Sequence, residues 1–174
     1  MNSKTYFIGD HHLGHKNILK FREFDKFNSV DDHDAFLITK HNEIVTNEDT
    51  VYFMGDFAFN LNALDKARLF NGRKKLLCLG NHDNRSATRY EKHFNKCFAS
   101  EKLSTDTLIT HIPIHECEFT YRIDFNIHAH HHDRLFGLDE RYICTSLDLS
   151  EGIPLTLEQW RDVNDRIKNK SKNN

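Results

Sequence analysis

Aspartate, asparagine and histidine recur in five short clusters, and several of these clusters directly follow an apolar run. In chain order they are Asp10-His11-His12, Gly55-Asp56, Gly80-Asn81-His82-Asp83, Thr110-His111-Ile112-Pro113 and His128-Ala129-His130-His131-His132-Asp133. Imidazole and carboxylate groups without thiolates suit Mn, Fe, Zn, Ni or Co ions. Two such ions, about 3.5–4 Å apart, clamp the attacking and leaving oxygens of a phosphoryl transfer. The clusters are numerous enough to supply a site of this kind.

Strands and helices must carry these clusters to one place. Strands are expected at Thr5–Gly9, Thr50–Met54, Lys75–Leu79, Thr107–Thr110, Ile123–His128 and Arg141–Ser146. Helices are expected near Asp31–Val45, Asn60–Phe70 and Ser86–Phe94, and a last helix follows a Thr156–Gln159 capping box. This order favours a layered α/β sandwich. Binding sites of open α/β sheets lie beyond the carboxyl ends of strands, which is where Asp10, Asp56 and Asn81 would meet.

Composition and charge narrow the class of protein. The chain of 174 residues, 29% of them charged, suits a single soluble domain at residues 1–168, with a polar tail at 169–174 that is expected to fray. No apolar run is long enough for a membrane span or a signal peptide. A net charge of −2 argues against binding of long nucleic acid, and four widely spaced cysteines favour free thiols in a reducing, cytoplasmic setting.

The clusters, in this order, resemble the calcineurin-like metallophosphoesterase family, whose pattern reads Asp-x-His, Gly-Asp, Gly-Asn-His-Asp, His and Gly-His-x-His. The match spreads over residues 10 to 132, and the element Gly80-Asn81-His82-Asp83 is specific by itself. The resemblance implies an α/β fold, a four-layer α-β-β-α sandwich with its metal site at the C-terminal ends of the strands. It also implies a cofactor of two divalent transition-metal ions, Mn first, with Fe, Zn, Ni or Co as alternatives.

The resemblance also implies roles for single residues. The implied metal ligands are Asp10, His12, Asp56, Asn81, His111, His130 and His132. Among them, Asp56 would bridge the two ions. His82 would contact the phosphate and protonate the leaving oxygen, and Asp83 would orient His82.

The last cluster departs from the family pattern, because no glycine precedes its histidine pair. Ala129-His130-His131-His132 fits with Ala in place of Gly, and Ile127-His128-Ala129-His130 fits with Ile. Ala is the smaller change where the backbone passes close to a metal. His130 and His132 are therefore preferred as ligands of the second and first ion, and His128 would lie behind the ligands or face the substrate.

For other residues near the clusters, the sequence leaves two interpretations of their role. His15 is expected either to touch the substrate or to pack within its loop, and Arg22 either to meet a phosphate or to be solvated. Phe21, Phe24 and Phe27 recur at a spacing of three, for which core packing is favoured over a platform that stacks bases. The helical histidines His33, His41 and His93 are expected at the surface.

The predicted function is hydrolysis of phosphodiester bonds in a small or nucleotide-type substrate, by in-line attack of a hydroxide that bridges the two metals. Phosphomonoesterase activity is the second reading. A non-catalytic scaffold of the same fold is the third, although such proteins typically lose Asp10, Asn81 or His82, which are all present here. The expected partner is a small phosphate ester, without a membrane, and the sequence leaves the oligomeric state open.

Overall fold

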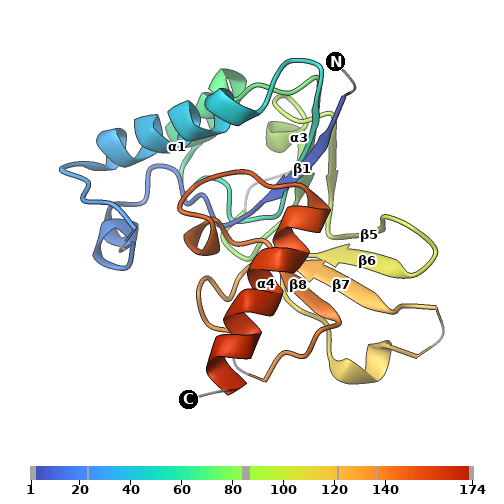
Figure 1. The fold of residues 1–174 in the computed structure, drawn as a ribbon. Coiled ribbons are helices and arrows are strands. Elements are labelled where there is room, and N and C mark those ends of the chain that lie inside the picture. Colours follow the sequence, from blue (N-terminus) through green and yellow to red (C-terminus); the bar gives the residue numbers. More distant parts are fainter. Residues whose placement is uncertain (1–2, 23, 84–86, 121, 136, 173–174) are drawn as a thin grey trace.

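Two four-stranded β-sheets form the centre of the molecule in the computed structural model, which describes residues 3–22, 24–83, 87–120, 122–135 and 137–172 (Figure 1). The first sheet contains β1 (Thr5–Ile8), β2 (Thr50–Phe53), β3 (Lys74–Cys78) and β4 (Lys96–Phe98), all parallel and in that order. The second contains β5 (Ser100–Lys102), β6 (Thr107–Thr110), β7 (Phe125–His128) and β8 (Tyr142–Cys144), with only β5 antiparallel to its neighbour. The expected α/β class is confirmed.

Helices and short 3-10 turns connect the strands. The helices are α1 (Val30–Ile44), α2 (Leu61–Leu64), α3 (Ala87–Tyr90) and α4 (Leu157–Lys172), and the turns are η1 (Lys16–Lys20), η2 (Asp65–Leu69), η3 (Glu116–Glu118) and η4 (Leu147–Leu149). The helix expected at Asn60–Phe70 is thus α2 followed directly by η2. Of the helix expected at Ser86–Phe94, the described part of the chain contains only α3. Ser86 itself lies outside the described residues.

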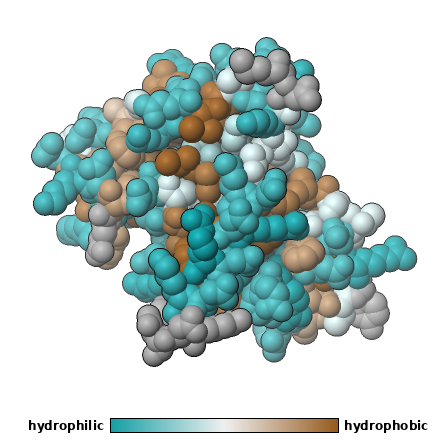
Figure 2. Space-filling model, viewed as in Figure 1, coloured by the Kyte–Doolittle hydropathy of each residue, from teal (hydrophilic) through white to brown (hydrophobic). Residues whose placement is uncertain are grey.

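Caps fix where the two long helices begin. Ser29 accepts a hydrogen bond from the Asp32 amide at the start of α1. At the start of α4, the expected capping box is confirmed: the Thr156 amide donates to the Gln159 side chain at 2.9 Å, and the Gln159 amide donates to the Thr156 hydroxyl at 3.4 Å. Helix α4 continues to Lys172, into the expected polar tail, whose residues 173–174 lie outside the described residues. Figure 2 shows that the outward face of α4 is hydrophilic.

The two faces of the first sheet pack into different cores, because successive side chains of a strand point in opposite directions. On one face, Ile8 and Val51 join Leu37 of α1. On the other face, Phe7 joins Ile127 of the second sheet, so this core lies between the sheets. Trp160 of α4 is fully buried in the same core, and its indole N–H donates to the Phe7 carbonyl at 2.7 Å.

The two sheets meet where β1 and β8 end. Gly9 forms a parallel bridge with Ser146. The Gly9 amide donates to the Thr145 carbonyl at 2.9 Å, and the Leu147 amide donates to the Gly9 carbonyl at 3.2 Å. This junction brings the loops that follow strands of both sheets to one edge of the molecule. Among the described helices, none is long and apolar enough to cross a membrane.

Candidate metal centre

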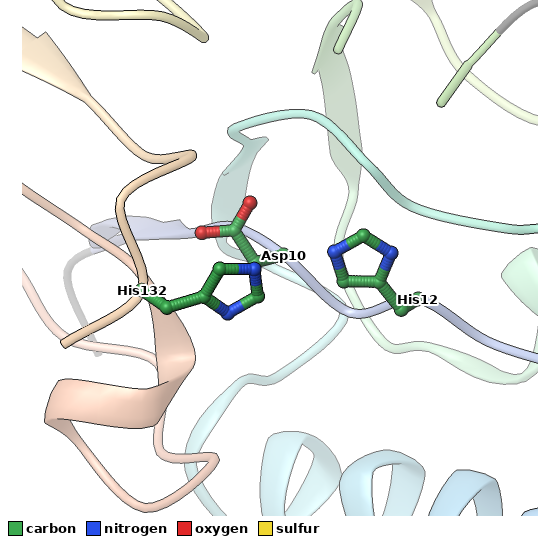
Figure 3. Close-up of side chains that lie close together, drawn as sticks. All are labelled: Asp10, His12 and His132. Carbon is green, nitrogen blue, oxygen red and sulfur yellow. The ribbon is translucent and has the colours of Figure 1, made fainter. Parts of the chain in front are cut away.

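Two groups of three side chains converge beyond the carboxyl ends of the strands. The first group is Asp10, His12 and His132, and the second is Asp56, His111 and His130. In each group, one potential ligand atom from every residue lies within 4.8 Å of the others. Figure 3 shows the first group, with Asp10 and His12 on the segment after β1 and His132 arriving from a segment far away in the sequence. His130 and His132 each belong to one of these groups, and His128 belongs to neither.

Asp56 belongs to the second group and also faces the first. Its Oδ2 atom is 3.7 Å from His12 Nε2 in the first group and 3.3 Å from His111 Nε2 in the second. Its Oδ1 atom accepts a hydrogen bond from the His82 amide at 2.8 Å. Burial raises the pKa of Asp56, but the hydrogen bond and charge of His111 outweigh this and lower it. The carboxylate is therefore ionised and shared by both groups.

Two of the histidines are held so that Nε2 faces the cluster. His111 Nδ1 lies 2.7 Å from the Met54 carbonyl, which can only accept, so this nitrogen carries the proton. His132 Nδ1 lies 2.6 Å from Asp148 Oδ2. Burial lowers the pKa of His111, but the hydrogen bond with Asp56 and the charges of Asp10 and Asp56 raise it to about 9. A cluster that stabilises positive charge on a histidine stabilises a bound cation for the same reason.

His12 is buried, and neither of its ring nitrogens has a hydrogen-bond partner among the described residues. Burial lowers its pKa well below the usual value, so the ring is neutral and keeps a lone pair. Buried polar atoms are nearly always hydrogen-bonded, and an unpartnered one indicates a bound water or ion, or a catalytic role. The ring faces Asp56, so a metal ion is the partner that fits the donor set.

Five of the candidate ligands adopt the left-handed backbone conformation, which L-residues rarely do. They are Asp10 (φ 61°), His12 (φ 50°), Asp56 (φ 51°), His130 (φ 69°) and His132 (φ 52°). This conformation costs roughly 1–2 kcal/mol per residue, and such strain gathers at functional sites. Asp10 and His12, two positions apart in the chain, both belong to the first group.

Glycines make room for the ligands. A Cβ atom on Gly55 would lie 2.3 Å from His111 Nδ1, and one on Gly80 would lie 2.2 Å from Asp56 Oδ1. A Cβ atom on Gly9 would lie 2.5 Å from the Cβ of Ala129. The methyl group of Ala129 is therefore accommodated because position 9 has no side chain.

Asn81 and His82 stand at the exposed side of the cluster. Asn81 Oδ1 lies 3.1 Å from His111 Nε2, beside the second group. The His82 ring is exposed, and its centroid is 5.3 Å from that of His12. His82 is thus accessible to a molecule that approaches the two groups from solvent.

Asp83 differs from its expected role of orienting the His82 ring. Both of its oxygens face backbone amides and not the His82 ring: Oδ2 accepts from Asp56 at 2.8 Å and from Gly80 at 2.9 Å, and Oδ1 accepts from Phe57 at 3.1 Å. Burial raises the pKa of Asp83 to about 6 in spite of these bonds. Asp83 positions the loop that carries Asp56.

Arg22 is buried, so the expectation that it is solvated is wrong. Its guanidinium donates to the backbone carbonyls of Asp10 and His11, and its Nε atom lies 3.4 Å from Asp148 Oδ1. It therefore holds the segment around Asp10 in place. The His15 ring stacks on Phe59, which lies between β2 and α2, with centroids 4.2 Å apart.

His128 lies behind the cluster. It is fully buried, and its Nδ1 atom lies 2.8 Å from the Ala129 carbonyl. Asp148, the partner of His132, was not among the expected site residues. A signal for it exists in the sequence, since Asp148 follows the end of β8 as Asp10 and Asp56 follow β1 and β2.

The fold and the cluster define an α/β protein with a candidate two-metal centre. The chain is 32% identical over 136 residues to the uncharacterized protein MJ1445 of Methanocaldococcus jannaschii, which covers 74% of this chain and 69% of that protein. The chain belongs to the same family as MJ1445. No family model matches the chain.

Two phage proteins and one solved structure are also similar. The gene 66 proteins of Mycobacterium phages L5 and D29 are 36% and 35% identical over 86 residues, and the match spans about 40% of the length of each. The crystal structure of the protein of unknown function AQ665 from Aquifex aeolicus matches with a TM-score of 0.72 and covers 91% of this chain and 97% of that one. At 22% identity this likeness shows the fold alone.

Proposed function

We propose that this protein is a dinuclear-metal-dependent phosphoesterase of the calcineurin-like metallophosphoesterase family. Its two sheets and flanking helices would then be the four-layer α-β-β-α sandwich of that family. Its substrate would be a small or nucleotide-type phosphodiester. The observation that carries the proposal is the position of Asp56 Oδ2, which is 3.7 Å from His12 Nε2 and 3.3 Å from His111 Nε2. A shared carboxylate between two groups of N and O donors is what a pair of metal ions requires.

The residues fit the group that the proposal requires. Asp10, His12 and His132 would hold one divalent ion, Asp56, His111 and His130 the other, and the amide oxygen of Asn81 adds a donor to the second. Imidazole and carboxylate donors accept Mn, Fe, Zn, Ni or Co, and Mn is the first choice. Two such ions, when bound, would supply a water of lowered pKa and would neutralise the phosphoryl oxygens.

The chain's own side chains supply orientation and a proton. Asp148 and the Met54 carbonyl hold the rings of His132 and His111, so that the free nitrogens need no reorganisation on binding. The exposed ring of His82 would donate a proton to the phosphate or to the leaving oxygen. Asp83 would keep this loop in place through its backbone contacts with Asp56 and Gly80.

The test combines metal analysis with a pair of substrates. The purified chain, incubated with Mn, is expected to bind two ions and to hydrolyse bis-p-nitrophenyl phosphate faster than p-nitrophenyl phosphate. Asp56→Asn is expected to lose bound metal and turnover while it stays folded. His93→Ala is the control, because His93 pairs with Asp65 outside the cluster.

Other outcomes separate the alternatives. Faster hydrolysis of the monoester would identify a phosphomonoesterase. No turnover of either ester by a metal-loaded, folded chain would identify a non-catalytic scaffold. A chain that binds no divalent ion would refute the two-metal centre.

A further inference from the structure

A pocket of about 720 Å³ opens beside the candidate metal centre. His130 and His132, one from each group, form one wall together with Asp148. Ile18, Phe21 and Phe24 give the same pocket an apolar, largely aromatic wall. A molecule in this pocket would touch the two ligand groups and an aromatic surface at the same time.

Phe21 is the most exposed large hydrophobic residue of the described chain, at 71%. Its neighbour Phe24 instead packs on Phe27 and Phe36, with ring centroids 5.9 and 6.1 Å apart. The expected core packing therefore describes Phe24 but is wrong for Phe21. Exposed apolar surface at the mouth of a pocket favours a ligand, since burial of a ring releases water and stabilises the complex.

Arg22 fixes the aromatic wall relative to the metal centre. It follows Phe21 directly, and its buried guanidinium is bound to the Asp10 carbonyl and to Asp148. Asp148 in turn holds His132. The Phe21 backbone amide is also bonded to the Ile18 carbonyl at 3.0 Å. The aromatic wall is thus preorganised beside the histidines, which lowers the entropic cost of binding.

The pocket lies away from His82. His82 is not among the residues that line it, and the His12 ring has its centroid 5.3 Å from that of His82 and 5.4 Å from that of His132. A leaving group must depart next to the residue that protonates it, which is the side of His82. The pocket beside His132 is then left for the ester group that stays on phosphorus.

We propose that this pocket binds the retained ester group of a phosphodiester, that this group is a flat aromatic ring as in a nucleoside, and that Phe21 stacks on it. The inference rests on the proposed function. Aromatic side chains stack on any nucleobase without reading its identity, so the pocket selects a class of substrate and not one base. Lys20 and Arg134 also line the pocket and add positive charge and hydrogen-bond donors for the polar edge of such a group.

Two diesters with the same leaving group isolate this role. Thymidine 5′-(p-nitrophenyl phosphate) and methyl p-nitrophenyl phosphate both release p-nitrophenolate and differ only in the retained group. We expect a higher kcat/KM for the thymidine ester. In Phe21→Ala, kcat/KM for that ester should fall about tenfold or more while the value for the methyl ester stays unchanged. Phe21→Tyr should restore the preference, and Leu69→Ala, at another exposed apolar residue, should not alter it.

Failure of this inference and failure of the proposed function give different results. If Phe21→Ala changes both esters equally or neither, the retained-group pocket is refuted while the phosphodiesterase stands. If neither ester is hydrolysed, the proposed function fails. Binding of thymidine 5′-monophosphate, measured by calorimetry, then tests whether the pocket binds a nucleoside. Weaker binding to Phe21→Ala than to the native chain supports the pocket, and equal or absent binding refutes it.

Discussion

The Nδ1 atom of His132 lies 2.6 Å from Oδ2 of Asp148, and this contact aims the other nitrogen of the ring at Asp10 and His12. Burial raises the pKa of Asp148, but the hydrogen bond with His132 and the charge of Arg22 lower it, so the carboxylate is ionised. It therefore accepts the Nδ1 proton and leaves Nε2 with its lone pair. A carboxylate behind a histidine in this way raises the basicity of the metal ligand.

Replacement of Asp148 by Asn should weaken metal binding at the first group (Asp10, His12 and His132) and leave the second unchanged. The amide carries no charge and no longer fixes the tautomer of His132, so affinity at that group should fall about 10- to 100-fold. Metal titration by calorimetry would measure this as one weakened and one unchanged binding event. Asp139→Asn, which alters a surface carboxylate paired with Arg141, is the control. Two unchanged affinities in a folded Asp148→Asn chain would show that the contact does not orient the ligand.

Gly80→Ala should displace Asp56. The added methyl group would meet Asp56 Oδ1 at 2.2 Å and the Asp56 backbone at 2.5 Å, so the loop after β2 must shift. The expected result is loss of bound metal together with a lower thermal midpoint, measured by metal analysis and calorimetry. Gly137→Ala is the matched control: nothing lies within 4 Å of its Cβ position, so only the backbone cost of a positive φ remains, about 1 kcal/mol. Equal effects of the two changes would contradict the steric argument.

The sequence predicts those parts of the fold and site that depend on local pattern. The ends of β1, β2 and β3 follow from apolar runs, and because parallel strands share an edge, Asp10 and Asp56 meet there. The choice of His130 and His132 over His128 as candidate ligands follows from the small size of Ala129, and the structure brings these two histidines, and not His128, into the two groups. Short strands were missed: β4 and β5 have three residues each, and Lys or Glu within them hides any apolar pattern.

Side-chain partners that come from distant segments were not predictable. His33, Leu37 and His41 recur every four residues on α1 and are all buried, although histidine is normally read as a surface residue in such a pattern. Arg22 likewise is buried through contacts with Asp10 and Asp148, and no local spacing reveals these. Burial of a polar side chain depends on the partner that the fold brings to it, which a single sequence does not show.

His82→Ala should reduce turnover and leave the metal centre intact. The ring is exposed and belongs to neither ligand group, so the variant should fold and bind two ions. Loss of a general acid should lower kcat about 100-fold or more for an alkoxide leaving group, and much less for p-nitrophenolate, which departs without a proton. Steady-state rates for a series of leaving groups measure this dependence, with His93→Ala as the control. A uniform loss across the series would exclude proton donation by His82.

Stability should fall in acid because of His41. Burial, with a smaller contribution from the charge of Lys75, lowers the pKa of His41 to about 4. The hydrogen bond that Nε2 donates to the Asn71 carbonyl, 2.9 Å long, opposes this shift. The unfolded chain takes up this proton near pH 6.5, so between about pH 6.5 and 4 it binds more protons than the folded chain, and the free energy of unfolding decreases as the pH falls. This contribution is present above about pH 6.5 and is lost towards pH 4. It amounts to about 2 kcal/mol between pH 7 and pH 5.

His41→Gln isolates that effect, because the Gln amide donates to the same Asn71 carbonyl and does not titrate. Urea unfolding at about pH 7 and pH 5 should show a loss of stability that is smaller in the variant by about 2 kcal/mol. The charge of His41 is one cause, after burial, of the lowered pKa of His11, so a part of the difference between the two chains comes through His11. His115→Gln, at an exposed histidine, is the control substitution. Parallel stability curves for the native chain and His41→Gln would show that His41 is not the group that titrates.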